Sequence, residues 1–161
     1  MKAHEAYIKA ITSIGGDHED EYSEYLTTDN EAAFESWLAS HPKVSGKTLY
    51  RGYKLDRSFY EDGDYSDGAI LSPLSLTGGF HPAFTEGLLR AAGYINEFGS
   101  DSDDGVKLFF EPHTSGKYMV DVSEHSVYPC ESEHHCTADA RFKVVKNERR
   151  GALIQITLEE I

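Results

Sequence analysis

The chain has 161 residues, 39% of them hydrophobic, and a formal net charge of −13. This length and composition fit one folded domain with a core of its own. Binding to a phosphate backbone requires a basic surface. Because the chain is acidic, we do not expect nucleic acid as a partner. It has no apolar run long enough to span a bilayer and no signal peptide, and its two cysteines fit free thiols in a reducing compartment. We therefore expect a cytoplasmic protein that does not bind membranes.

The first part of the chain is predicted to be helical. Apolar residues recur at near-helical spacing over residues 2–14 and again over Glu31–Ser40, a helix that Pro42 would stop. Lys47–Leu55 then alternates as a strand does, and the acidic, glycine-containing run Asp56–Gly68 reads as a long loop.

A second strand and a further helix are predicted next. Ala69–Leu76 has strand character, interrupted by Pro73. Pro82–Phe98 carries apolar residues near i, i+4 and i+7 spacing, which is typical of an amphipathic helix.

From Val106 onward the pattern changes to short strands, which we place at Val106–Glu111, Lys117–Val122, a segment around Glu131–Cys136, Arg141–Lys146 and Ala152–Leu158. Helices first and strands later indicate an α+β protein and not alternating βαβ units. We expect a single domain over residues 1–161, with a helical part at 1–45 and a β core at 46–161.

Two glutamates, Glu131 and Glu133, stand one residue apart after a Tyr-Pro pair. In an extended chain they would share one face, since side chains alternate along a strand. Two close carboxylates in a cleft repel, so one can stay ionised while the other handles a proton. The alternative is a solvated edge strand with two acids on its wet face, and the spacing alone favours that alternative.

Several motifs occur in an order that resembles one family. Arg51 lies in the strand Leu49-Tyr50-Arg51-Gly52, and later come VKLFFEP, KYMVDVSEHSVYP, the Glu-x-Glu pair and RFKVV. In this order they resemble the Arg–Ser–Glu class of mono-ADP-ribosyltransferases, which includes toxin-like and phage-encoded arginine modifiers. The resemblance covers about Thr48–Leu158 and implies a split mixed or antiparallel β-sandwich behind N-terminal helices.

The resemblance also implies roles for single residues. Arg51 would hold the diphosphate of NAD⁺ by bidentate hydrogen bonds, and Gly52 would let the backbone approach the ligand. Glu133 would bond the ribose next to nicotinamide and stabilise the oxocarbenium charge. Glu131 would orient the acceptor and take its proton. Tyr128, on the preceding turn, would contact the target protein, or would equally well cover the core as an aromatic lid.

The sequence departs from the family pattern in two places. The expected Ser-Thr-Ser strand falls on Leu71–Thr77, where Ser72, Ser75 and Thr77 are present, and we place Ser75 nearest the pocket. The segment after Glu133, apolar in the family, reads His134-His135-Cys136. Together with Cys130 this run allows a zinc site, but a distant second cysteine pair is lacking, so no metal is expected. His135, on the face of the glutamates, is expected to be their charge partner.

The resemblance implies an enzyme that cleaves NAD⁺ and transfers ADP-ribose to an arginine of a target protein, since glutamate at the first position of the pair is typical of arginine modifiers. The target would be a host protein if the enzyme is delivered into a host cytoplasm. Two alternatives stay open. One is an NAD⁺ glycohydrolase or an enzyme that modifies RNA or DNA. The other is a non-catalytic acidic inhibitor or adaptor that binds a basic partner.

Overall fold

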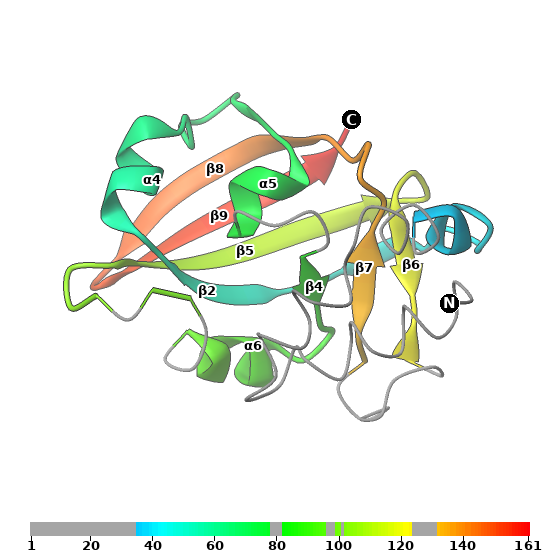
Figure 1. The fold of residues 1–161 in the computed structure, drawn as a ribbon, viewed down its shortest axis with the longest axis horizontal. Helices are drawn as coiled ribbons and strands as arrows, with labels where there is room; N and C mark the ends of the chain where they lie inside the picture. Colours follow the sequence, from blue (N-terminus) through cyan, green and yellow to red (C-terminus); the bar gives the residue numbers. More distant parts are fainter. Residues whose placement is uncertain (1–34, 78–81, 96–98, 101, 124–131) are drawn as a thin grey trace.

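The computed structural model in Figure 1 describes residues 35–77, 82–95, 99–100, 102–123 and 132–161, and its strands form two β-sheets. The larger sheet has the strand order β1-β5-β9-β8-β3, and β2 also pairs with β5. The smaller sheet has the order β4-β7-β6. All the strand pairs are antiparallel except β5 with β9, which are parallel. The predicted α+β class and the split pair of sheets are confirmed.

The strands of the larger sheet are β1 (Ser45–Thr48), β2 (Arg51–Leu55), β3 (Ile70–Leu71), β5 (Val106–Ser115), β8 (Phe142–Arg150) and β9 (Leu153–Glu160). Those of the smaller sheet are β4 (Ala83–Phe84), β6 (Met119–Asp121) and β7 (His134–Cys136). The helices are α4 (Arg57–Asp62), α5 (Pro73–Thr77) and α6 (Leu88–Tyr94), and residues 35–39 are also helical. Of the described helices, none is long and apolar enough to cross a membrane.

The larger sheet has a core on each face. Leu108, Phe110 and Ile156 point to the main core, which Leu76 of α5 also enters. On the opposite face, Phe109 packs with residues of α6. Figure 1 shows α4 and α5 on one side of this sheet and α6 on the other. Successive residues of β5 are therefore buried on alternate faces, as expected for a strand covered on both sides.

Gly52 lets α6 lie directly against β2. A Cβ atom built on Gly52 would stand 1.9 Å from the carbonyl oxygen of Ala91 and 2.7 Å from Cγ1 of Ile95. Any larger residue would collide with the helix backbone. The side of Gly52 on which a Cβ would stand thus faces α6, so helix packing accounts for this glycine without a bound ligand.

Several predicted elements differ from the structure, among them the strand predicted over Lys47–Leu55, which is divided into β1 and β2. The strand predicted over Ala69–Leu76 ends at Leu71 and gives way to α5, because Pro73 fits the first turn of a helix better than a sheet. The helix predicted over Pro82–Phe98 begins as β4, and only α6 is helical within its described part. The loop predicted over Asp56–Gly68 contains α4. The helix predicted over residues 2–14 lies outside the described residues.

The two sheets are joined where β4 meets the segment between β1 and β2. The backbone N–H of Tyr50 donates to the carbonyl of Thr85 at 2.8 Å, and the N–H of Thr85 donates back at 2.9 Å. A second link runs from the N–H of Val44 to the carbonyl of Met119 at 2.8 Å. The beginning of β2 is thereby held beside the smaller sheet.

Candidate active site

Arg51 is the first residue of β2 and reaches from the larger sheet to the smaller one. Its Nη1 donates to the carbonyl oxygen of Ala83 in β4 at 3.0 Å. Its Cζ lies 4.9 Å from the centroid of the Tyr53 ring, within cation–π range. These contacts fix the position of the guanidinium group at the junction of the two sheets.

Glu133 lies directly before β7 and is 3% exposed. Its Oε2 is 3.0 Å from Nε2 of His135, which is 1% exposed. Residues i and i+2 share a face as the chain enters the strand, which brings the two side chains together. The predicted closeness of His135 to a glutamate is confirmed for Glu133, as a contact between the two side chains.

The strand β4 connects the arginine to this pair. Ala83, whose carbonyl accepts from Arg51, is the Cα partner of His135 in the β4–β7 ladder. His135 in turn contacts Glu133. The structure therefore places Arg51 and Glu133 on neighbouring segments and not on opposite sides of the molecule.

The predicted serine-bearing strand is wrong, because Ser75 lies on α5. Its backbone N–H donates to the carbonyl of Ser72 at 3.0 Å, and its own carbonyl accepts a hydrogen bond from the hydroxyl of Tyr65. The first bond lies within the turn that begins α5, and the second joins α5 to the segment after α4. In the described residues, β4 and not α5 provides the strand that links Arg51 with Glu133.

Thr85 is a buried hydroxyl residue at this junction that the sequence did not single out. It follows β4, is 5% exposed, and forms the bridge to Tyr50, the residue before Arg51. Its Oγ1 accepts from the N–H of Gly87 at 3.2 Å. The helical spacing of the following residues concealed the strand. The available signal was a short run with a β-branched residue, bounded by Pro82 and Gly87.

The segment before β7 is not extended, contrary to the prediction. Ser132 has φ of 49°, in the left-handed region that residues with a Cβ rarely adopt. Its carbonyl accepts from Nδ1 of His134 at 2.7 Å, which stabilises this turn. The strand alternation invoked for the glutamate pair therefore does not hold across Ser132. Glu131 and Tyr128 lie outside the described residues.

Comparison with known proteins identifies the fold. No family model and no curated protein matches the chain. Solved structures do match. The toxin Vis of Vibrio splendidus, an ADP-ribosyltransferase solved with agmatine, aligns with a TM-score of 0.66 and 15% identity over 100% of this chain and 69% of that one. The chain has the ADP-ribosyltransferase fold.

Two further structures of this fold align over nearly the whole chain. The C3 exoenzyme of Clostridium limosum aligns with a TM-score of 0.61 and 10% identity over 99% of this chain and 84% of that one. Exoenzyme S of Pseudomonas aeruginosa, solved with human 14-3-3 protein beta and carba-NAD, aligns with a TM-score of 0.55 and 13% identity over 98% of this chain and 67% of that one. At such identities the likeness concerns the fold.

The histidine–cysteine run of β7 is part of the packing of this ADP-ribosyltransferase fold. Among the described residues, no group of three or more histidine, cysteine, aspartate or glutamate side chains could hold a metal ion. Burial raises the pKa of Cys136 far above its usual range, so this thiol stays protonated and unreactive. Nε2 of the buried His134 lies 3.9 Å from Oδ2 of Asp121.

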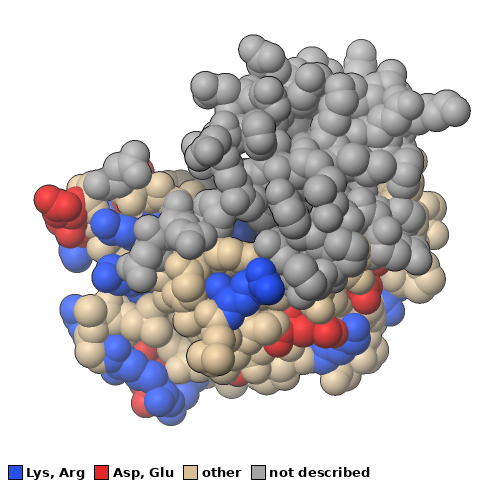
Figure 2. Space-filling model, turned by 90° about the horizontal axis from the view of Figure 1, so that it is seen from below, with Lys and Arg blue, Asp and Glu red and all other residues tan. Residues whose placement is uncertain are grey.

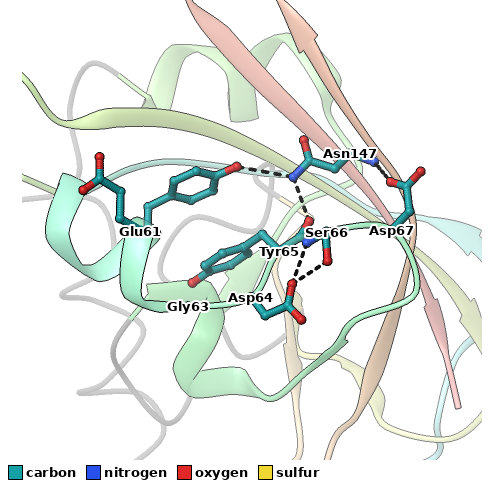
Figure 3. A pocket seen from close by; sticks show the side chains of 8 residues that line it. Glu61, Gly63, Asp64, Tyr65, Ser66, Asp67 and Asn147 are labelled. Atoms are coloured by element: carbon teal, nitrogen blue, oxygen red, sulfur yellow. Dashed lines mark hydrogen bonds between the residues drawn. The ribbon is translucent and has the colours of Figure 1, made fainter.

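A pocket of about 490 Å³ opens between α4, the segment after it and β8 (Figure 3). Nδ2 of Asn147 donates to the carbonyl of Tyr65 at 2.7 Å, and the Asn147 backbone N–H donates to Oδ1 of Asp67 at 2.7 Å. The described lining of this pocket is acidic and aromatic and includes neither Arg51 nor Glu133. A negatively charged dinucleotide is not expected to bind there.

On the face of the molecule that carries α6, the described basic residues do not form a continuous band. Figure 2, which views the side of α6, shows Lys and Arg in separate groups with Asp and Glu between them. In β8, Glu148 contacts both Lys146, at 3.3 Å, and Arg150, at 3.1 Å. This arrangement does not favour binding to a phosphate backbone.

Proposed function

We propose that the protein is a mono-ADP-ribosyltransferase that uses NAD⁺ to modify an arginine of a target protein. The observation that supports this most is the chain of contacts from Arg51 through Ala83 and His135 to Glu133, within an ADP-ribosyltransferase fold. It brings a group suited to a diphosphate near a group suited to a developing cation. The reaction we propose takes place in a cytoplasm, that of a host if the protein is delivered.

In this proposal Arg51 binds the diphosphate of NAD⁺ through guanidinium N–H donors, while Nη1 keeps its bond to Ala83. The bond between the ribose carbon and the nicotinamide nitrogen breaks, and its electron pair leaves with neutral nicotinamide. Glu133 bonds a hydroxyl of the adjacent ribose and stabilises the positive charge left on that ring. Thr85 stands beside this path, and we propose that it replaces the expected Ser75 and Ser72 as the hydroxyl of the site.

Arginine is the acceptor that we favour. A guanidinium nitrogen attacks the ribose carbon, forms the new C–N bond, and gives its proton to Glu131. The structure of Vis with agmatine, which carries the same guanidinium group, shows such a group bound on this fold. The net charge of −13 also attracts a basic target protein. Tyr128 is proposed to contact that target.

The central test replaces Glu133 by Gln, which keeps the size of the side chain and removes its charge. We expect both NAD⁺ consumption and labelling of the target to fall about 100- to 1,000-fold, since the charge acts on the transition state. Mass spectrometry of a lysate treated with NAD⁺ measures labelling. The matched control is Glu148→Gln, on the surface of β8, which should leave both rates unchanged. Normal rates in Glu133→Gln would contradict the proposal.

A second experiment separates transfer from hydrolysis. Glu131→Gln should lose transfer to arginine or agmatine and keep part of the hydrolysis of NAD⁺, because water needs less orientation than a guanidinium group. An equal loss of both activities would argue against separate roles for the two glutamates. Release of free ADP-ribose without adducts would instead identify a glycohydrolase. No heat on titration with NAD⁺ would favour the non-catalytic adaptor.

A further inference from the structure

We infer that His135 is a positioning residue for Glu133, holding the carboxylate in place for the reaction. This inference rests on the proposed function. It gives a role to His135, which lies in the segment after Glu133 that is apolar in the family the sequence resembles. Nε2 of His135 and Oε2 of Glu133 are 3.0 Å apart, and the two residues are 1% and 3% exposed. In this inference the ring donates its Nε2–H to the carboxylate of Glu133, which accepts it.

The backbone of His135 is well suited to this task. His135 is the middle residue of β7, and its Cα is paired with Ala83 of β4 on one side and Val120 of β6 on the other. Its ring therefore projects from the central strand of a sheet. Groups placed on such paired strands are held more precisely than groups on loops.

Glu133 itself lacks that support. It precedes β7 and follows Ser132, whose φ is 49°, so it lies at the end of a turn and outside the ladder. Its carbonyl accepts from the N–H of Val122 at 3.0 Å, which fixes the backbone but not the side chain. The bond to His135 restricts the carboxylate, and burial shields that bond from competing water.

This geometry gives the two oxygens of the Glu133 carboxylate different partners. Oε2 is held by His135, and the second oxygen can accept from the ribose hydroxyl. Without the ring, the side chain would sample other rotamers and meet the substrate in a productive position less often. Misplacement by about 1 Å can cost about 100-fold in rate.

The test compares His135→Leu, which removes the donor, with His135→Gln, which keeps an N–H donor. We expect kcat for NAD⁺ cleavage to fall about 100-fold in His135→Leu with KM within about 3-fold, and His135→Gln to recover at least about 10-fold of the loss. In a Glu133→Gln background, His135→Leu should cost less than about 2-fold, since the two side chains act as one unit. A kcat of His135→Leu within about 2-fold of the parent would overturn the inference.

A readout that does not need activity separates this inference from the proposed function. Nitrogen NMR of the His135 ring should show Nε2 protonated in the parent protein and shifted in Glu133→Gln. His113→Leu, at an exposed position of β5, is the control for removing a histidine. An unprotonated Nε2 would overturn the inference even if the enzyme were active. If the parent protein binds no NAD⁺, but its Nε2 is protonated and shifts in Glu133→Gln, only the proposed function is refuted.

Discussion

His134 is fully buried in β7, where its Nδ1 donates to the carbonyl of Ser132 and its Nε2 faces Asp121. Burial lowers the pKa of His134 below its ordinary value of 6.5, because the charged ring would lose its hydration, although nearby Asp121 acts in the opposite direction. As pH falls, the unfolded chain therefore binds a proton at this histidine before the folded protein does. The free energy of unfolding is expected to fall as pH drops from 6.5 through the lower pKa of the folded state.

Urea unfolding of the parent protein and His134→Gln, from about pH 7.5 to about pH 5, measures this effect. The parent should lose stability over this range, and the variant should lose less, because it lacks the titrating ring. Subtracting the two curves removes contributions of other groups, such as Glu35, whose pKa burial raises and whose effect has the opposite sign. Parallel curves would show that His134 does not couple to folding here.

Sequence reasoning at single positions succeeded where the chain is extended and failed where it turns. The partnership of His135 with Glu133 follows from the alternation of side chains, and the structure bears it out. The turn at Ser132 could not be foreseen, since serine is not one of the residues that usually adopt positive φ. Thr85 was missed because the helical spacing of the residues after it concealed a short strand whose pairing partner, Tyr50, is distant in sequence.

Among the elements, long strands were predictable and very short ones were not. The strands β5, β8 and β9 lie where short strands were predicted, although each runs further than expected. In contrast, β3 and β4 have two residues each, too few for a periodic pattern. Strands this short form because a neighbouring strand offers them hydrogen bonds. Since that neighbour is distant in sequence, local pattern does not predict them.

The contact of α6 with β2 leads to a prediction about Gly52. Because its Cβ position lies 1.9 Å from a backbone oxygen of α6, Gly52→Ala should lower the free energy of unfolding by about 1–3 kcal/mol as the helix is pushed away. The matched control is Gly93→Ala, within α6, whose Cβ position has nothing within 4 Å. That substitution should raise stability by about 0.5–1 kcal/mol. Chemical denaturation compares the two, and equal effects would mean that α6 does not pack as described.

The overall class of the molecule could be predicted because it depends on the order of elements and not on their exact ends. Helix-like segments before a series of strands indicated α+β, and the two sheets agree with it. How the sheets meet could not be predicted. That junction rests on the two hydrogen bonds between Tyr50 and Thr85 and on the side chain of Arg51. These are contacts between segments about thirty residues apart, which local pattern does not encode.

The net charge of −13 leads to a prediction about the whole molecule and its target. If a basic protein is the acceptor in the proposed reaction, long-range attraction should speed its encounter with this protein, and salt should screen that attraction. Raising ionic strength from about 0.01 M to about 0.15 M shortens the Debye length from about 30 Å to about 8 Å. We therefore expect kcat/KM for labelling a basic protein to fall by about 10-fold or more over this range.

Two controls make this prediction specific to the target. Hydrolysis of NAD⁺ without an acceptor should change much less, because the dinucleotide meets a local site around Arg51 and not the field of the whole surface. An acidic protein carrying an exposed arginine should be labelled slowly at low salt and no more slowly as salt rises, since repulsion is screened as well. If basic and acidic acceptors lost the same fraction of their rate, the charge of the protein would have no part in choosing a target.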